Sequence, residues 1–493
     1  MRLCLVLVTI VALSHRAPLA QAPASRFDAL AAFAEVKMRD YRVPGVALGI
    51  LDNGVVTTRG LGVTNVEEPL PVTGHTVFPI ASISKTFAAT AAMRLVEQGK
   101  LDLAAPVRNY LPDFKVRDET VARDVTIWNL LTHSPGWEGQ VSGPERGEDT
   151  LRNFVATVMP DLMQVAPLDS AQGKPATAAW SYNNAAYSTA GRVIEIANGT
   201  SINRAMRDLV FTPLGLEHAG TTAGDFIVNR FAAGHVNRAD APPALMRPYT
   251  HATSVTSGGI GLCITDLLTY AKFHLGDGTN ARGERILTRA SLDLMKTPQL
   301  EKQSTDDAIG LSWHIRRVGG VHPSVRVAGQ GGTAGGHILV LSIVPERNFA
   351  IGILTNSSAG WRLIQDVERE ALRVYHGIVY GKNQAIAHRG LVETLPNIEP
   401  LAVQPDLKPY VGRYQRPTNA IDVRMAGGAL VVQDIPSTGE PRPGMPIAFF
   451  GPDRAVITSG TDRGQSIEFI RASDGAVRWV RVVGRVAVRG IAK

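Results

Sequence analysis

The sequence predicts an α+β fold with a helical insertion, followed by a small all-β barrel. Strand-like segments lie at both ends of residues 23–383, and mainly helical patterns from Ser84 to about Thr297 separate them. This order favours one sheet that is assembled from distant segments and flanked by helices. Around prolines 396, 400 and 405 the pattern breaks, and an all-β pattern follows.

The first elements expected are a helix and a hairpin. The segment RFDALAAFAEVKMRDY has helical periodicity and is ended by Pro44-Gly45. Two apolar segments then flank Asn53-Gly54, a strong signal for a two-residue hairpin turn. The next segment, SKTFAATAAMRLVEQG, is typical of a buried helix with Gly99 as its C-terminal cap.

Strand signals return in SVRVAGQGG, GHILVLSIVP and NFAIGILTN, and an amphipathic helix follows in RLIQDVEREALRVY. We expect one large domain over residues 23–383, a proline-marked linker over 384–406 and a separate barrel or meander over 407–493. Asp474-Gly475 predicts a hairpin turn within that last region.

Composition excludes several classes of protein. With 493 residues, 44% of them hydrophobic, the chain can bury a large core. Only 19% of the residues are charged, which argues against a mostly disordered chain. The net charge of +7 comes from scattered residues without a dense basic run, so nucleic acid is not an expected partner.

The N-terminus has the pattern of a secretory signal peptide. One early arginine, an apolar run from Leu3 to Leu13 and the small residues around Gln21 predict cleavage after Ala22, hence residues 1–22 as the signal. An uncleaved short anchor is the alternative, although the run is short for a membrane span. We therefore expect an exported protein, periplasmic or secreted, with Cys263 as its sole cysteine and without zinc-type Cys/His spacing.

The most reactive motif is Ser82-Ile83-Ser84-Lys85 at the start of the buried helix. A serine there lies where free N–H groups and the helix dipole favour developing negative charge. Lys85 follows by one turn, so its amine can reach the Ser82 hydroxyl and, when surrounded by apolar residues, accept its proton. The alternative is a structural role, in which Ser82 caps the N-terminus of the helix and Lys85 is a solvated residue of its first turn.

A second motif, WSYNNAAYSTAGRVIEIANG, places Tyr182 and Asn184 before another helix. A phenol near an ammonium can ionise partly and shuttle protons, and an amide can orient a substrate carbonyl. Alternatively, Tyr182 is a core residue and Asn184 an N-cap. Tyr187 is expected to pack into the helix face.

The third motif, VAGQGGTAGG, has glycines in a strand-like segment. Glycines weaken a strand unless a ligand or another backbone approaches closely. The edge of this segment could supply a backbone N–H, for instance from Thr333, which with the N–H of Ser82 would form an oxyanion hole. A flexible loop between strands is the alternative.

The three motifs, in this order and at these separations, resemble the serine β-lactamase/penicillin-binding-protein superfamily. The resemblance is strongest to its class C, esterase and D-peptidase branch. It extends over about residues 27–378 through PGVALGIL, LLTHSPGW, FTPLGLEH, TSGGIGLCITDLLTYAKF and VPERNFAIGILTN. The segment DLKPYVGRYQ is similar to the start of the lipocalin-like domain found after many such hydrolases.

The resemblance implies an antiparallel sheet flanked by helices and an acyl-enzyme mechanism without metal or organic cofactor. It implies Ser82 as nucleophile, Lys85 as proton acceptor, Tyr182 as general acid/base and Asn184 as substrate-orienting amide. The opposite wall would be Gln330, Gly331, Gly332 and Thr333. The expected partner is a small-molecule or peptide substrate; the sequence does not indicate the oligomeric state.

The sequence departs from the family pattern at Gln330, where lysine is usual in β-lactamases and histidine in many relatives. Glutamine carries no charge, so it attracts a substrate carboxylate less than lysine does. We therefore expect cleavage of ester or amide bonds in small or peptide-like substrates, with weak β-lactam turnover. The alternatives are a β-lactamase or D,D-carboxypeptidase, and a non-catalytic sensor of cell-wall peptides.

Overall fold

A computed structural model describes most of the chain. The described residues are 25–140, 149–166, 179–238, 241–247, 254–304, 307–319, 324–380, 386–388, 392–395, 398–460 and 462–490. The predicted signal peptide lies outside them. None of the described helices has the length and apolar character needed to cross a bilayer.

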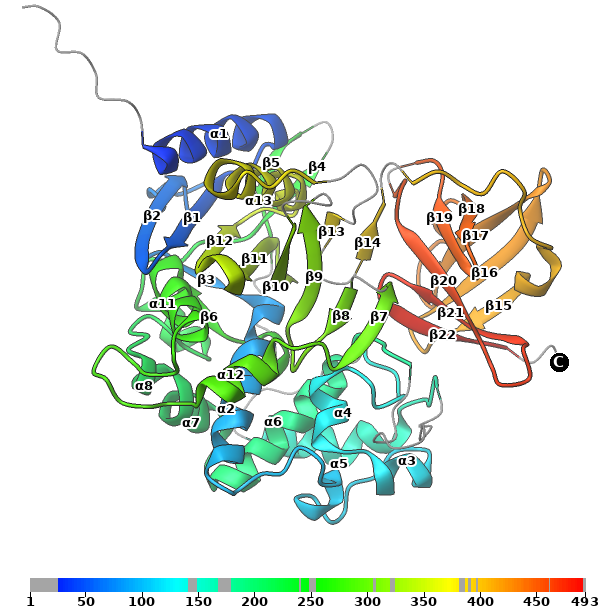
Figure 1. The fold of residues 1–493 in the computed structure, drawn as a ribbon, viewed down its shortest axis with the longest axis horizontal. Coiled ribbons are helices and arrows are strands. Elements are labelled where there is room, and N and C mark those ends of the chain that lie inside the picture. Colours follow the sequence, from blue (N-terminus) through cyan, green and yellow to red (C-terminus); the bar gives the residue numbers. More distant parts are fainter. Residues whose placement is uncertain are drawn as a thin grey trace, which may run out of the picture.

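An eight-stranded antiparallel sheet forms the centre of the larger part of the molecule (Figure 1). Its strands are β1 Gly45–Asp52, β2 Val55–Gly62, β7 Leu300–Ser304, β8 Asp307–Ile309, β9 His314–Gly319, β10 Ser324–Ala334, β11 His337–Val344 and β12 Phe349–Thr355. They lie in the order β2-β1-β12-β11-β10-β9-β8-β7. The N-terminal hairpin thus pairs with strands from the far side of the insertion, which confirms the predicted sheet of distant segments.

The turn between β1 and β2 is the predicted one. Asn53 and Gly54 have φ angles of 48° and 85°, the left-handed values that a type I′ turn requires at both central positions. This turn sets the register in which Asp52 pairs with Val55.

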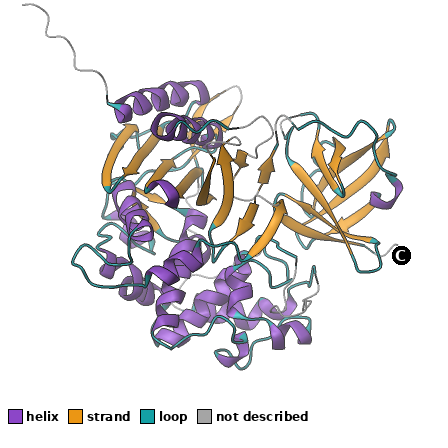
Figure 2. Cartoon of the chain, viewed as in Figure 1, coloured by secondary structure: helices purple, strands orange, loops and turns teal. Residues whose placement is uncertain are grey.

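Helices cover both faces of the sheet (Figure 2). They are α1 Arg26–Tyr41, α2 Ser84–Glu97, α3 Glu119–Asp124, α4 Ile127–Leu131, α5 Thr150–Thr157, α6 Asn184–Asn198, α7 Ile202–Met206, α8 Thr212–Leu214, α9 Ala223–Ile227, α10 Val255–Gly258, α11 Ile264–Leu275, α12 Arg289–Met295 and α13 Gly360–His376. Along β1, Val46 and Leu48 pack with α1 and α13, whereas Ala47 packs with α2 and α11. Successive side chains of a strand point to opposite faces, so both faces are apolar and buried.

The insertion between β2 and β7 is mainly helical, as expected, and also holds two short antiparallel pairs. β3 Val77–Pro79 pairs with β6 Gly261–Cys263, and β4 His235–Arg238 pairs with β5 Ala241–Leu245. The β3–β6 pair leads directly into the segment that carries Ser82.

A closed eight-stranded barrel follows, as predicted for the C-terminal region (Figure 1). Its strands are β15 Gly412–Gln415, β16 Asn419–Ala426, β17 Ala429–Pro436, β18 Met445–Gly451, β19 Arg454–Ile457, β20 Ser466–Arg471, β21 Val477–Val482 and β22 Arg485–Arg489. Gly475 has φ 78° in the β20–β21 connection, so the predicted Asp474-Gly475 turn is confirmed. The barrel interior is filled by Tyr414, Phe449 and Phe469 with aliphatic neighbours.

The segment expected as a linker contains a short hairpin, β13 Ile386–His388 with β14 Val392–Thr394. Its C-terminal part attaches to the barrel. The N–H of Leu395 donates to Gly464 O at 2.6 Å, and the N–H of Leu401 donates to Phe449 O at 2.7 Å.

Candidate active site

Ser82 lies in a tight turn between β3 and α2. The turn is a short 3₁₀ segment, Ala81–Ile83, and Ala81 has a φ of 46°, which is unfavourable for a residue with a side chain. Ser82 is half-buried, whereas Ser84 is buried and its Oγ accepts the N–H of Ile260 at 3.1 Å. Of the two hydroxyls, Ser82 is therefore the one that faces the site.

Lys85, in the first turn of α2, is completely buried. Its Nζ lies 3.2 Å from Ser82 Oγ and donates to Ser257 O at 2.5 Å. It also lies 4.8 Å from the ring centre of Tyr182. Burial, and secondarily the positive charge of Arg485, lowers the pKa of Lys85 well below its ordinary value. An amine that loses its proton easily and lies beside a hydroxyl can accept the hydroxyl proton.

Tyr182 is the third member of the cluster and is also buried. Burial raises the pKa of its phenol to about 12, although hydrogen bonding with Ser82 and Gln330 acts in the opposite direction. A phenol beside a lysine was expected to ionise partly. Burial instead keeps the phenol protonated, so Tyr182 is a proton donor in the resting site.

Two histidines that were not predicted as site residues line the Tyr182 ring. His133 stacks on it with the ring centres 4.5 Å apart, and His314 stacks with ring centres 6.2 Å apart. Burial lowers the pKa of both imidazoles well below the ordinary value, so both are neutral. His133 lies in the landmark LLTHSPGW, which could have flagged it; His314 has no comparable signal.

The two asparagines after Tyr182 have different roles. Asn183 is the N-cap of α6: its side chain accepts the N–H of Ala186 at 2.8 Å and donates to Trp137 O at 2.8 Å. Asn184 is the first residue of the helix and is half-buried. The cap considered for Asn184 therefore belongs to Asn183.

Strand β10 forms the wall opposite Ser82. β9 pairs with β10 from Ser324 to Gly329, whereas β11 continues along Gln330 to Ala334. The Nε2 of Gln330 donates to Ser82 O at 3.2 Å. A Cβ on Gly332 would lie 2.6 Å from Ile80 O, so this glycine allows β10 to approach the serine turn.

The other two members of the predicted wall differ in exposure. Gly331 is buried within β10, and Thr333 is exposed. The structure thus brings Ser82, Lys85, Tyr182 and Gln330 together, with Gly332 against the turn.

The barrel reaches this site, which the sequence did not indicate. The N–H of Tyr182 donates to Gly484 O at 2.9 Å, and the N–H of Val486 donates to Ser181 Oγ at 3.1 Å. Arg481 Nε donates to Trp180 O at 3.0 Å. The turn between β21 and β22 is therefore attached to the backbone that carries Tyr182.

Arg485, at the start of β22, extends over the Tyr182 ring. Its guanidinium carbon lies 5.3 Å from the ring centre. Its Nε is buried without a hydrogen-bond partner among the described residues. A buried cation next to a lysine is unfavourable unless an anion balances the charge.

A Ser-Lys-Tyr cluster between an antiparallel sheet and a helical insertion is the arrangement expected of serine hydrolases with the β-lactamase fold. The Beta-lactamase family matches residues 30–374, which is more than half of the chain, and the chain belongs to that family.

Relatives of the family are similar over different lengths. "Penicillin-binding protein 4" of Amycolatopsis lactamdurans is 30% identical over 79% of this chain and 96% of its own length. "Esterase EstB" of Burkholderia gladioli is 33% identical over 41% of this chain and 52% of its own length. The solved structure "Crystal structure of SurE with D-Leu" superposes with a TM-score of 0.72 at 25% identity, over 94% of this chain and 99% of that one.

Proposed function

We propose that the protein is an exported serine hydrolase that cleaves ester or amide bonds in small or peptide-like substrates through a Ser82 acyl-enzyme. The observation that carries this proposal is the 3.2 Å separation between Ser82 Oγ and a buried Lys85 amine of lowered pKa. The signal-like N-terminus supports export to the periplasm or medium. Intact mass of the protein recovered from cell fractions tests the expected cleavage after Ala22.

In the proposed reaction, Ser82 Oγ attacks the carbonyl carbon while Lys85 accepts the hydroxyl proton. The negative oxygen of the tetrahedral intermediate is held by backbone N–H groups of Ser82 and Thr333. Tyr182, held protonated by burial, donates to the leaving group and then, as phenolate, takes a proton from the incoming water. When the tetrahedral intermediate of hydrolysis collapses, Lys85 returns its proton to Ser82 Oγ, and both residues regain their starting state.

Covalent labelling tests the nucleophile. A fluorophosphonate or penicillin probe should add one adduct to wild type, located by mass spectrometry at Ser82, and no adduct to Ser82→Ala. Ser84→Ala is the matched control, because its hydroxyl accepts a backbone N–H and should not affect labelling. Absence of a Ser82-dependent adduct would favour the non-catalytic sensor.

Gln330 supports a preference of the enzyme for ester or amide substrates that carry no carboxylate. Its amide donates to the Ser82 carbonyl and carries no charge for a β-lactam carboxylate. We expect kcat/KM to be higher for a short-chain aryl ester than for a chromogenic cephalosporin. A large preference for the cephalosporin would contradict this assignment. A panel that adds D-amino-acid amides identifies the substrate class.

Arg485 favours a second candidate, a D,D-carboxypeptidase or β-lactamase. It places a cation over Tyr182. A substrate carboxylate could pair with this cation, since Gln330 carries no charge to attract it. For such an enzyme, Arg485→Gln should raise KM for a carboxylate-bearing peptide about tenfold or more and leave a neutral aryl ester unchanged. Equal effects on both substrates would exclude this role.

A further inference from the structure

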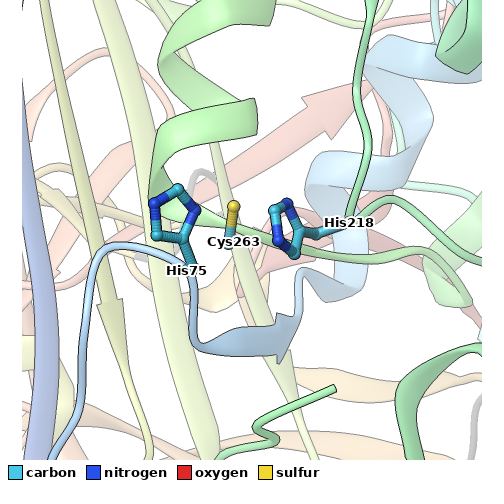
Figure 3. A group of neighbouring side chains, drawn as sticks. All are labelled: His75, His218 and Cys263. Atoms are coloured by element: carbon cyan, nitrogen blue, oxygen red, sulfur yellow. The ribbon is translucent and has the colours of Figure 1, made fainter. Parts of the chain in front are cut away.

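Two histidines and the buried cysteine come together away from the catalytic cluster. Each of His75, His218 and Cys263 offers one ligand atom, and these atoms lie within 4.8 Å of one another. Figure 3 shows the Cys263 sulfur between the two imidazole rings. The three residues come from distant parts of the chain, so no metal-site spacing was visible in the sequence.

The fold holds these residues on three adjoining segments. Cys263 ends β6, which pairs with β3 so that Cys263 lies opposite Val77. His75 lies just before β3. The segment with His218 is attached to β6 by two hydrogen bonds between Gly220 and Gly261, of 2.9 and 3.0 Å. Backbone hydrogen bonds between these segments therefore hold the three side chains close together.

The donor atoms have few competing partners. The Cys263 sulfur accepts one N–H, from Asp266, at 3.5 Å. The Nδ1 of His218 is buried and makes no hydrogen bond to a described residue. Asp266 lies beside both: its carboxylate is 3.7 Å from that Nδ1 and accepts the backbone N–H of His218 at 2.7 Å. His75 is exposed and provides the solvent side of the cluster.

We propose that His75, His218 and Cys263 bind a zinc-class divalent ion. Thiolate and imidazole together are the ligands of zinc sites, and three protein ligands leave a fourth position for water. Asp266, whose carboxylate accepts the backbone N–H of His218, is the outer carboxylate that holds this residue in place. On binding, the thiol proton leaves to solvent, and the ion itself stabilises the thiolate.

The ion would link the segment before β3, the end of β6 and the segment before Gly220. Because β3 continues into the Ser82 turn, this link would stabilise the position at which that turn begins. It takes no part in the proposed hydrolysis, so it can be tested whether or not Ser82 is a nucleophile.

Cobalt titration of the metal-stripped full-length protein tests the proposal, because Co²⁺ replaces zinc and its thiolate complexes absorb in the near-ultraviolet. Wild type should bind one Co²⁺ with a thiolate charge-transfer band that added Zn²⁺ removes. Cys263→Ser should lose the band. His75→Ala, at an exposed position, should fold normally and weaken binding more than about tenfold. Asp266→Asn should weaken binding about tenfold to a hundredfold.

One variant serves as the matched control. His376→Ala removes a histidine on α13 and should bind Co²⁺ as wild type does. Absence of the band in wild type, or a band that survives Cys263→Ser, would overturn the proposal. Binding that is unaffected by His75→Ala would overturn the proposed ligand set.

Discussion

At the scale of single residues, burial sets the protonation of the catalytic cluster. Lys85 and Tyr182 are both enclosed, and desolvation favours the uncharged form of each. The neutral form of the amine, which can accept a proton, is thereby favoured, and the phenol is kept as a proton donor. This division is the one that the acylation step requires.

Replacing Lys85 by arginine tests the acceptor. Arginine keeps a positive charge but does not release its proton, so acylation should fall about 10²- to 10⁴-fold. Pre-steady-state release of an aryl alcohol measures this step. Lys100→Arg, at an exposed position just beyond the end of α2, is the control and should behave as wild type. Acylation retained in Lys85→Arg would mean that another group takes the proton.

The pH profile of wild type follows from the same shift. The reactive form of Lys85 is the neutral amine, so kcat/KM should decline as pH falls through the lowered pKa of that amine. Because the pKa lies well below its ordinary value, this decline should occur at lower pH than an exposed lysine would give. If kcat/KM already declined as pH was lowered through the ordinary lysine pKa, the assignment of Lys85 would be contradicted.

With an aryl ester, whose phenolate leaving group departs without a proton from Tyr182, Tyr182→Phe separates deacylation from acylation. The ring would remain stacked on His133 while the hydroxyl is lost, so the acyl-enzyme should accumulate and be visible in the intact mass. We expect turnover to fall about a hundredfold or more.

Tyr187→Phe is the matched control for this change. Its hydroxyl donates to Leu131 O at 2.8 Å inside the core, so its loss should cost about 1 kcal/mol of folding free energy without accumulation of adduct. Adduct accumulation in both variants would show a general packing effect instead.

At the scale of elements, the close approach of β10 to the Ser82 turn depends on Gly332. Its added Cβ would lie 2.6 Å from Ile80 O and 3.0 Å from Ala81 Cβ. Both neighbours belong to the turn that holds Ser82. An added Cβ on Gly332 would therefore push this turn away from β10 and displace Ser82.

Gly332→Ala should therefore lower stability by about 1–3 kcal/mol, as overpacking does, and lower kcat/KM by a larger factor than stability alone explains. Chemical denaturation and aryl-ester kinetics measure the two effects. Gly451→Ala, in β18 with no heavy atom within 4 Å of its added Cβ, is the control. Unchanged kinetics in Gly332→Ala would show that the turn tolerates the displacement.

Local patterns were sufficient to predict many elements. The Asn53-Gly54 hairpin, the buried helix after Ser82 and the amphipathic helix α13 each follow from periodicity and turn chemistry. For Gly332, a close approach of another backbone was predicted. The group that approaches, the Ile80 carbonyl, was not, because it depends on tertiary packing. The same limit applies to His314 and Arg485, which reach the site through strand pairing that no local pattern encodes.

At the scale of the whole molecule, Arg481 connects the barrel to the larger domain. Arg481 of β21 donates to Trp180 O at 3.0 Å and to Lys302 O of β7 at 2.9 Å. It also forms an ion pair with Glu468 of β20. Figure 1 shows these barrel strands beside β7. The barrel thereby holds the backbone next to Tyr182, and activity should depend on this contact.

Arg481→Leu tests that dependence. Removing one partner of a buried ion pair should cost about 3–5 kcal/mol, because Glu468 would be left without its counter-charge. The double variant Arg481→Leu/Glu468→Leu should regain much of that stability, since neither charge remains buried. It should not regain activity, because the bonds to Trp180 and Lys302 are still missing. Arg478 lies on the same strand as Arg481 and forms an exposed ion pair with Asp474. Arg478→Ala should change stability by less than about 1 kcal/mol and leave activity unchanged. Thermal unfolding and aryl-ester kcat/KM measure the three variants. If the stable double variant were fully active, the barrel contact would be a folding element only and the position of Tyr182 would not depend on it.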